Sequence, residues 1–119
     1  MGVNDRTVRA YLEAALWSST DEEGEPLDAV FSVDDFAQSA VDQAASDLDD
    51  FFAANEEAIE ESGLSDKEVA HNFWLTRNRH GAGFWDRGLG EIGEELTEAA
   101  HAYGESDAYE GDDGQIYLT

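Results

Sequence analysis

The feature that most constrains the fold is a long run of apolar residues at helical spacing between residues 33 and 62. The segment opens with Ser32 and Asp35, a capping-box pair with Asp in the usual Glu position, and it is followed by Gly63, a typical C-terminal glycine. We therefore predict one helix over residues 33–62, about 45 Å long, with Asn55 as the point where a break would fall. Side chains three or four residues apart share one face of a helix, and here they are Val33, Ala37, Ala40, Val41, Ala44, Leu48, Phe51, Phe52, Asn55 and Ile59.

Three further segments have apolar residues at helical spacing. They cover residues 4–17, 65–77 and 89–103, which brings the predicted number of helices to four. Their end signals are Asn4 or Asp5 as the first N-cap, Ser65 and Glu68 as a second capping box, and Gly104 as the stop of the last helix.

The remaining segments indicate a surface loop and a hairpin. Residues 19–31 are acidic and polar and contain the only proline, Pro26, so they are predicted to form a surface loop. Residues 106–119 read as two short strands around the turn-forming Asp113-Gly114 dipeptide. We predict one α+β, mostly α, domain over residues 1–119, with four helices, one of them long and acidic, and a small C-terminal β-hairpin.

Length and residue inventory narrow the class of protein. A chain of 119 residues is long enough to fold as one domain without disulfides or a structural metal. The absence of cysteine excludes disulfides and thiolate chemistry. No apolar run approaches the roughly 18 residues of a membrane span, and the N-terminus lacks a signal-peptide pattern. We expect a soluble, cytoplasmic protein with no membrane partner.

Charge is the strongest compositional signal. The chain has 29 acidic and six basic residues, a formal net charge of −23, yet 41% of its residues are hydrophobic, which favours a folded chain over a disordered one. Residues 20–68 hold 17 acids and one lysine, a net charge of −16. Residues 34–61 hold ten acids and no cation, although like charges at i,i+4 cost a helix about 0.2–0.5 kcal/mol per pair. Something other than helix stability favours this pattern.

The acids of the predicted long helix recur at a seven-residue step, which returns to nearly the same face. Such a ladder of carboxylates attracts a basic groove and repels nucleic acid, so we expect a basic protein partner and no direct nucleic-acid binding. The predicted partner-binding residues are Asp34, Asp35, Asp42, Asp49, Asp50, Glu56, Glu57, Glu60 and Glu61.

Three interpretations of the ladder stay open at this point. In the first, it imitates a phosphate backbone and occupies the nucleic-acid groove of another protein. In the second, the organism lives at high salt, where the Debye length is about 3 Å at 1 M, and acidity serves solubility. In the third, it is a solvated helix face without a partner. The oligomeric state also stays open, with a dimer among the options.

Known chemical motifs do not fit the chain. Residues 88–93 match G-x-G-x-x-G, but no predicted strand precedes them and Glu91 would repel a phosphate. The three histidines lack a spacing found in zinc sites, and the acids of residues 107–115 have no calcium-loop register. No nucleophile context accompanies the histidines and acids. We predict no enzymatic activity, no metal and no cofactor.

Residues 72–90, NFWLTRNRHGAGFWDRGLG, concentrate arginines, aromatic residues and glycines. Aromatic and arginine side chains together can bind single-stranded nucleic acid, which is a weaker alternative function. We instead predict a structural role, with the arginines paired to nearby carboxylates such as Asp86 and Glu91 and the aromatics in the core. The predicted structural residues are Trp74, Arg77, Phe84, Trp85 and Arg87.

The wording of this segment resembles a known group of proteins. FWLTRNRHGAGFWDRGLG, followed by LTEAAHAYGESDAYEGDDGQIYL, is similar to the C-terminal half of small, mostly uncharacterised phage and prophage proteins that carry an NFWLTRN-HGAGFWDRG segment. The resemblance covers about residues 71–118, so we assign residues 71–119 to a phage-family C-terminal half; it implies a viral or mobile-element origin and no particular chemistry. By analogy with acidic DNA mimics that block CRISPR and restriction systems, the first hypothesis is a non-enzymatic DNA-mimic inhibitor of a host defence protein. The alternative is a phage accessory protein of a salt-adapted host.

Overall fold

Five α-helices and one hairpin form the structure, a computed structural model that describes residues 4–20, 23–79, 83–84 and 88–119. The predicted class, mostly helical with a small C-terminal hairpin, is confirmed, whereas the predicted count of four helices is wrong because the segment 33–62 is divided. In chain order the elements are α1 (Asp5–Ser18), the 3-10 turns η1 (Leu27–Ala29) and η2 (Val33–Asp35), α2 (Gln38–Ala54), α3 (Glu56–Ser62), α4 (Asp66–Arg77), α5 (Glu91–His101), β1 (Ala108–Glu110) and β2 (Ile116–Leu118).

The first correction to the predicted long helix lies at its start. The capping pair is present, with the Ser32 N–H donating to the Asp35 carboxylate at 2.8 Å, but it caps only the turn η2. Phe36 and Ala37 are extended, and the Ala37 N–H donates to the Ile116 carbonyl oxygen at 2.9 Å. Helix α2 therefore begins at Gln38, because β2 pairs with the two residues before it.

The second correction is a break at Asn55, the position singled out in the sequence. Its backbone leaves the helical region at φ −122° and ψ 23°, and its side-chain amide donates to the Phe51 carbonyl oxygen at 2.9 Å. Asparagine side chains compete in this way for the backbone groups of a helix. Helix α3 then runs to Ser62 and ends at Gly63, whose φ of +73° is left-handed as the C-terminal glycine requires.

The other helix ends and the hairpin turn follow the local sequence signals. The Asn4 side chain accepts the Thr7 N–H at 2.9 Å at the start of α1. Both bonds of the Ser65 and Glu68 capping box form at the start of α4, at 3.2 and 3.1 Å. A side-chain cap of this kind contributes about 0.5–2 kcal/mol. In the hairpin, Gly114 takes a φ of +80° in the turn between β1 and β2.

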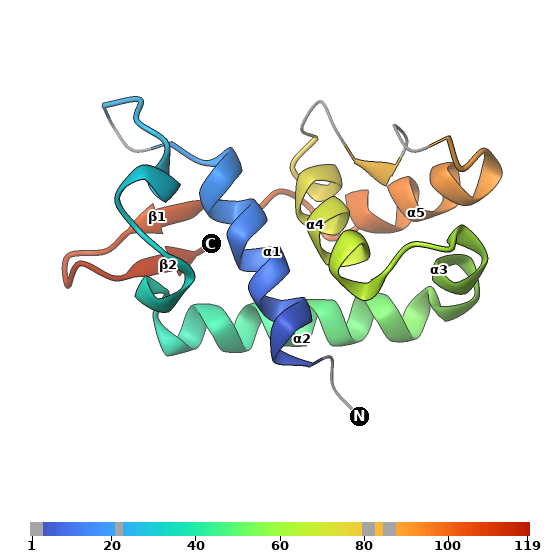
Figure 1. Cartoon of the computed structure of the whole chain (residues 1–119), viewed down its shortest axis with the longest axis horizontal. Helices are drawn as coiled ribbons and strands as arrows, with labels where there is room; N and C mark the ends of the chain where they lie inside the picture. Colours follow the sequence, from blue (N-terminus) through green and yellow to red (C-terminus); the bar gives the residue numbers. More distant parts are fainter. Residues whose placement is uncertain (1–3, 21–22, 80–82, 85–87) are drawn as a thin grey trace.

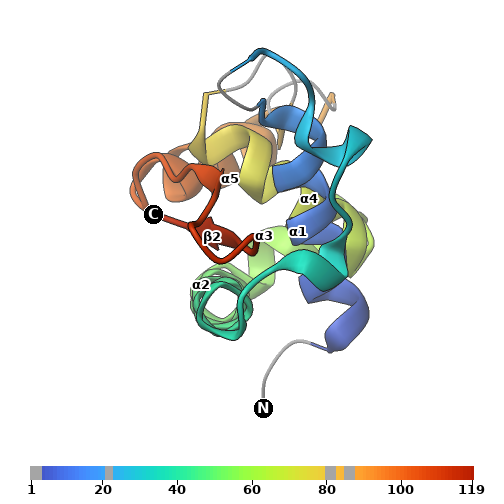
Figure 2. The ribbon, with the colours of Figure 1, turned by 90° about the vertical axis from the view of Figure 1, so that its left-hand side faces the viewer.

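The elements form two layers around one core. Helix α1 packs mainly against α4, α2 lies across them, and α3 packs beside α5 (Figures 1 and 2). The hairpin lies at the other end, beside the start of α2 (Figure 1). The shortest dimension is 21 Å, which corresponds to about two helix diameters of 10–12 Å each.

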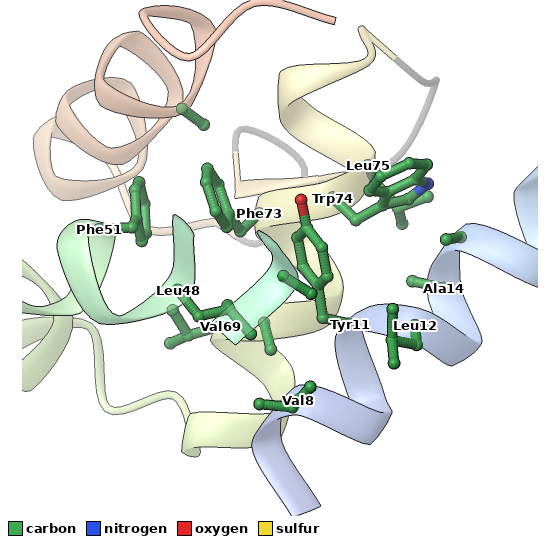
Figure 3. Packing of buried hydrophobic residues seen from close by; sticks show 14 of the residues in the cluster. Val8, Tyr11, Leu12, Ala14, Leu48, Phe51, Val69, Phe73, Trp74 and Leu75 are labelled. Atoms are coloured by element: carbon green, nitrogen blue, oxygen red, sulfur yellow. The ribbon is translucent and has the colours of Figure 1, made fainter. Parts of the chain in front are cut away.

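Aromatic rings from α1, α2 and α4 fill the core (Figure 3). Phe51 stacks on Phe73 with ring centroids 4.2 Å apart, and Tyr11 meets Trp74 edge-on at 5.3 Å. The buried Trp74 indole N–H donates to the Ser18 hydroxyl at 2.8 Å, so its polar edge is satisfied. These contacts join the helices through side chains that are far apart in sequence.

Arg77, at the end of α4, is the buried cation of the described residues; it is only 6% exposed and contacts several elements. Its Nη1 donates to the Tyr11 hydroxyl and to the Asp47 carboxylate, both at 2.9 Å. Its Nε donates to the Gly104 carbonyl at 2.9 Å, and its Nη2 donates to the Tyr103 carbonyl at 3.1 Å. The expected carboxylate partners of the arginines in this segment were Asp86 and Glu91. For Arg77 the ion-pair partner is instead Asp47 of α2, whereas Asp86 lies outside the described residues.

We expect Arg77→Ala to destabilise the chain by about 3–5 kcal/mol, because it leaves the partners of a buried ion pair unsatisfied. Arg9→Ala is the matched control: it removes the exposed Arg9–Asp34 ion pair, 3.3 Å long, and we expect a loss of at most about 1 kcal/mol. Urea unfolding followed by circular dichroism measures both free energies. Equal losses for the two variants would contradict the central role of Arg77.

Candidate functional site

The first two predicted partner-binding carboxylates lie at η2 and have partners within the chain. Asp34 is exposed and accepts from Arg9, whereas Asp35 accepts the Ser32 N–H in the capping pair. Both contacts stabilise the loop around η2. Neither residue continues an acidic helix face, because η2 is separated from α2.

The predicted carboxylates of α2 also make internal hydrogen bonds. Asp42 is exposed and accepts from Gln38 at 2.9 Å, one helical turn earlier. Asp50 accepts the Tyr103 hydroxyl at 2.5 Å, and Asp49 is half-buried. These three carboxylates therefore do not form the continuous, fully exposed ladder that the sequence predicted.

Asp47 is a carboxylate of α2 with a structural role that the sequence analysis did not predict. It is the ion-pair partner of Arg77 at 2.9 Å and also accepts from Gln43. A signal was present, because position 47 lies three residues after Ala44 and beside Leu48, on the apolar stripe. A single acid on the apolar face of a helix indicates a buried cation elsewhere in the chain.

Exposed carboxylates gather instead where α3 packs against α5 (Figure 1). The predicted glutamates of α3 are all exposed, and the α5 glutamates beside them, which were not predicted as partner-binding, are exposed as well. No ion pair reaches any of these eight side chains within the described part of the chain. We call this set the acidic end: Glu56, Glu57, Glu60, Glu61, Glu91, Glu94, Glu95 and Glu98.

A groove of about 410 Å³ borders the acidic end, between the end of α2, α3 and the start of α4. Its apolar floor includes Phe52, Ile59 and Leu64, and its acidic residues include Glu56 and Glu60. Such a surface suits a lysine or arginine side chain, whose aliphatic stem can lie on apolar groups while the charged head meets carboxylates.

The glycines of the G-x-G-x-x-G match have a packing explanation. A Cβ atom at Gly93, within α5, would lie 3.2 Å from the Phe84 carbonyl oxygen and 3.2 Å from the Leu89 Cβ atom. Gly90 is the N-cap of α5 with a φ of +65°. Gly93 therefore allows α5 to pack closely against Phe84, and Gly90 allows the turn that precedes α5.

Within the described ranges, no group of three or more acids or histidines is arranged to hold a metal ion. None of the helices there is both long and apolar enough to cross a bilayer.

The aromatic and arginine segment is mostly interior where the structure describes it. Phe73, Trp74, Phe84 and Arg77 are all buried, and Arg79 is exposed. These four buried side chains cannot stack on a nucleic acid while the chain is folded, which argues against the single-strand binding alternative. His80, Trp85, Asp86 and Arg87 lie outside the described residues.

Comparison with family models, with curated proteins and with solved structures finds no match for this chain.

The Arg77 network perturbs two tyrosines. Burial raises the pKa of Tyr11 to about 12, although the Arg77 guanidinium acts in the opposite direction. Burial and the hydrogen bond to Asp50 raise the pKa of Tyr103 above its usual value of 10. Both phenols therefore keep their protons in the folded chain at pH values where an unfolded chain loses them.

We expect the chain to lose stability as the pH rises above 10. The contribution of Tyr11 is fully present below pH 10 and is lost between pH 10 and about 12, where only the unfolded phenol is ionised; it amounts to about 2–3 kcal/mol. Urea unfolding at pH 9 to 12 measures this loss. The single lysine adds little to the slope, whereas Tyr103, whose pKa is also raised, contributes to it in the parent chain and in the variant alike. Tyr11→Phe should flatten the slope, and an equally steep slope in that variant would contradict the assignment.

Proposed function

We propose that the chain is a non-enzymatic DNA mimic that occupies the nucleic-acid groove of a basic host defence protein, a CRISPR effector or a restriction enzyme. The observation that carries the proposal is the packing of α3 against α5, which joins eight exposed glutamates from two distant segments. Neither helix contains a lysine or arginine.

The charge density of the acidic end supports mimicry. The four glutamates of α3 lie within six residues and those of α5 within eight, so each helix carries about one charge per 2–3 Å of its axis. One strand of DNA carries a phosphate about every 3.4 Å. A cationic groove that neutralises phosphates would meet a comparable density of negative charge on these helices.

The resemblance of residues 71–118 to phage proteins adds a biological reason, since phages benefit from small acidic proteins that block host nucleases. The absence of cations from α3 and α5 adds a physical one, since like charges at i,i+4 cost helix stability. A partner that supplies the missing cations would offset that cost on binding.

A second candidate function is that of a phage accessory protein from a salt-adapted host. The observation that favours it is that exposed carboxylates also occur on elements outside the acidic end. They include Glu23, Glu25, Asp28, Asp66, Glu68, Glu105, Asp107, Glu110, Asp112 and Asp113.

Two variants with the same change in charge test the mimicry proposal. One replaces Glu56, Glu57, Glu60 and Glu61 by Gln; the matched control carries Glu105→Gln, Asp107→Asn, Glu110→Gln and Asp112→Asn in the hairpin region. We expect the α3 variant to bind a purified CRISPR effector or restriction enzyme at least about tenfold more weakly, a loss of about 1.4 kcal/mol. The control should bind within about twofold of the parent chain. Competition with labelled duplex DNA gives the affinities.

Two results of that experiment would count against mimicry. Equal losses in both variants would show that net charge alone drives binding. A complete lack of DNA-competitive, salt-sensitive complexes with these enzymes would remove the proposed target class.

A thermal melt across salt separates the two candidate functions. The glutamates of α3 are about 5–6 Å apart at i,i+4. The Debye length falls from about 8 Å at 0.15 M to about 3 Å at 1 M, so it drops below this separation before 1 M is reached. Under mimicry we expect the Tm to rise between 0.05 and 0.5 M salt and then to level off. A chain that folds fully only above about 1 M would support salt adaptation instead.

A further inference from the structure

A pocket of about 430 Å³ lies away from the acidic end, between α1, the turns η1 and η2, and α4. Figure 1 shows the η1 and η2 segment on one side of α1, and α3 and α5 beyond α4 on the other. The pocket is within the size range of ligand-binding clefts. We call it the Trp17 pocket, after the exposed tryptophan in its lining.

Aromatic side chains line the Trp17 pocket. Trp17 is 52% exposed, and its ring centroid is 6.0 Å from that of His71, with the half-buried Phe31 as a further wall. Val30, next to Phe31, is 66% exposed. Trp17 and Val30 are two of the three large apolar side chains that are exposed within the described residues. Exposed apolar side chains mark interaction surfaces, where tryptophan is a frequent anchor.

Carboxylates surround these rings. Glu13 and Asp28 line the pocket and are exposed, and Asp34 lies next to Val33 at its edge. Arg9 is the cation of the lining, and its guanidinium is held by Asp34 at 3.3 Å. Three carboxylates against one guanidinium leave the pocket negative.

We propose that the Trp17 pocket binds an arginine side chain of a basic partner protein. A guanidinium is planar, stacks on aromatic faces and accepts two carboxylates at its edge, which matches a tryptophan ring flanked by Glu13 and Asp28. The identification of the partner as a basic protein rests on the proposed function. The preference of the pocket for arginine rests on its own lining.

The direct test uses a peptide and its neutral isostere. Acetyl-Gly-Arg-Gly-amide and the same peptide with citrulline are titrated into the ¹⁵N-labelled chain, and the signals of the Trp17 indole and of the backbone around Glu13 and Asp28 are followed by NMR. We expect saturable shifts with the arginine peptide and none with citrulline. Equal shifts with both peptides, or shifts spread over all acidic surfaces, would overturn the proposal.

Variants of opposite expected sign sharpen the test. Trp17→Ala should weaken arginine binding by about fivefold or more, and Glu13→Gln with Asp28→Asn by about threefold or more. Arg9→Gln should strengthen binding about twofold, because it removes the competing cation and frees Asp34. All four residues are exposed, and the matched control is Glu110→Gln with Asp112→Asn, which should leave the affinity unchanged. Losses in the control as large as in the pocket variants would overturn the proposal.

Failure of this inference and failure of the proposed function give different results. If the arginine peptide binds at the pocket but no host nuclease is captured, the pocket assignment stands and mimicry fails. If a DNA-competitive complex forms and Trp17→Ala changes neither that complex nor peptide binding, the pocket assignment fails and mimicry stands.

Discussion

The structure depends on one buried guanidinium. Arg77 joins α1 through Tyr11, α2 through Asp47 and the segment after α5 through the Tyr103 and Gly104 carbonyls. A buried charge is tolerated only when its donors are satisfied, so these contacts favour one arrangement of the helices over others. The chain has only six lysine and arginine residues. Arg77, which is buried, serves the fold rather than the surface.

The acidic residues divide into two groups with different roles. Asp35, Asp47 and Asp50 hold the fold together through a cap, an ion pair and a tyrosine hydroxyl. The glutamates of α3 and α5 are exposed and stay at one end of the molecule. The candidate surface for a basic partner therefore includes fewer carboxylates of α2 than the seven-residue ladder indicated. It gains the exposed glutamates of α5, which the ladder did not include.

Local signals in the sequence predicted local structure well. Asn4, Ser65 and Gly63 mark helix ends because their side chains or backbone freedom act within a few residues, and Asp113-Gly114 forms the hairpin turn for the same reason. The extended Phe36 and Ala37 were not predictable in this way. Their helical pattern is overridden by pairing with Ile116, 80 residues later in the chain.

By itself the sequence determined the helical character, most helix ends, the hairpin and the large negative charge, because each depends on residue type and short-range spacing. Only the tertiary structure decided which carboxylates make internal hydrogen bonds or ion pairs and which are exposed to solvent. It also decided that α3 and α5 lie together and that Trp17 borders an acidic pocket. These features depend on contacts between segments that are dozens of residues apart. Side-chain packing around Arg77 selects among the possible contacts, and no local pattern in the sequence does so.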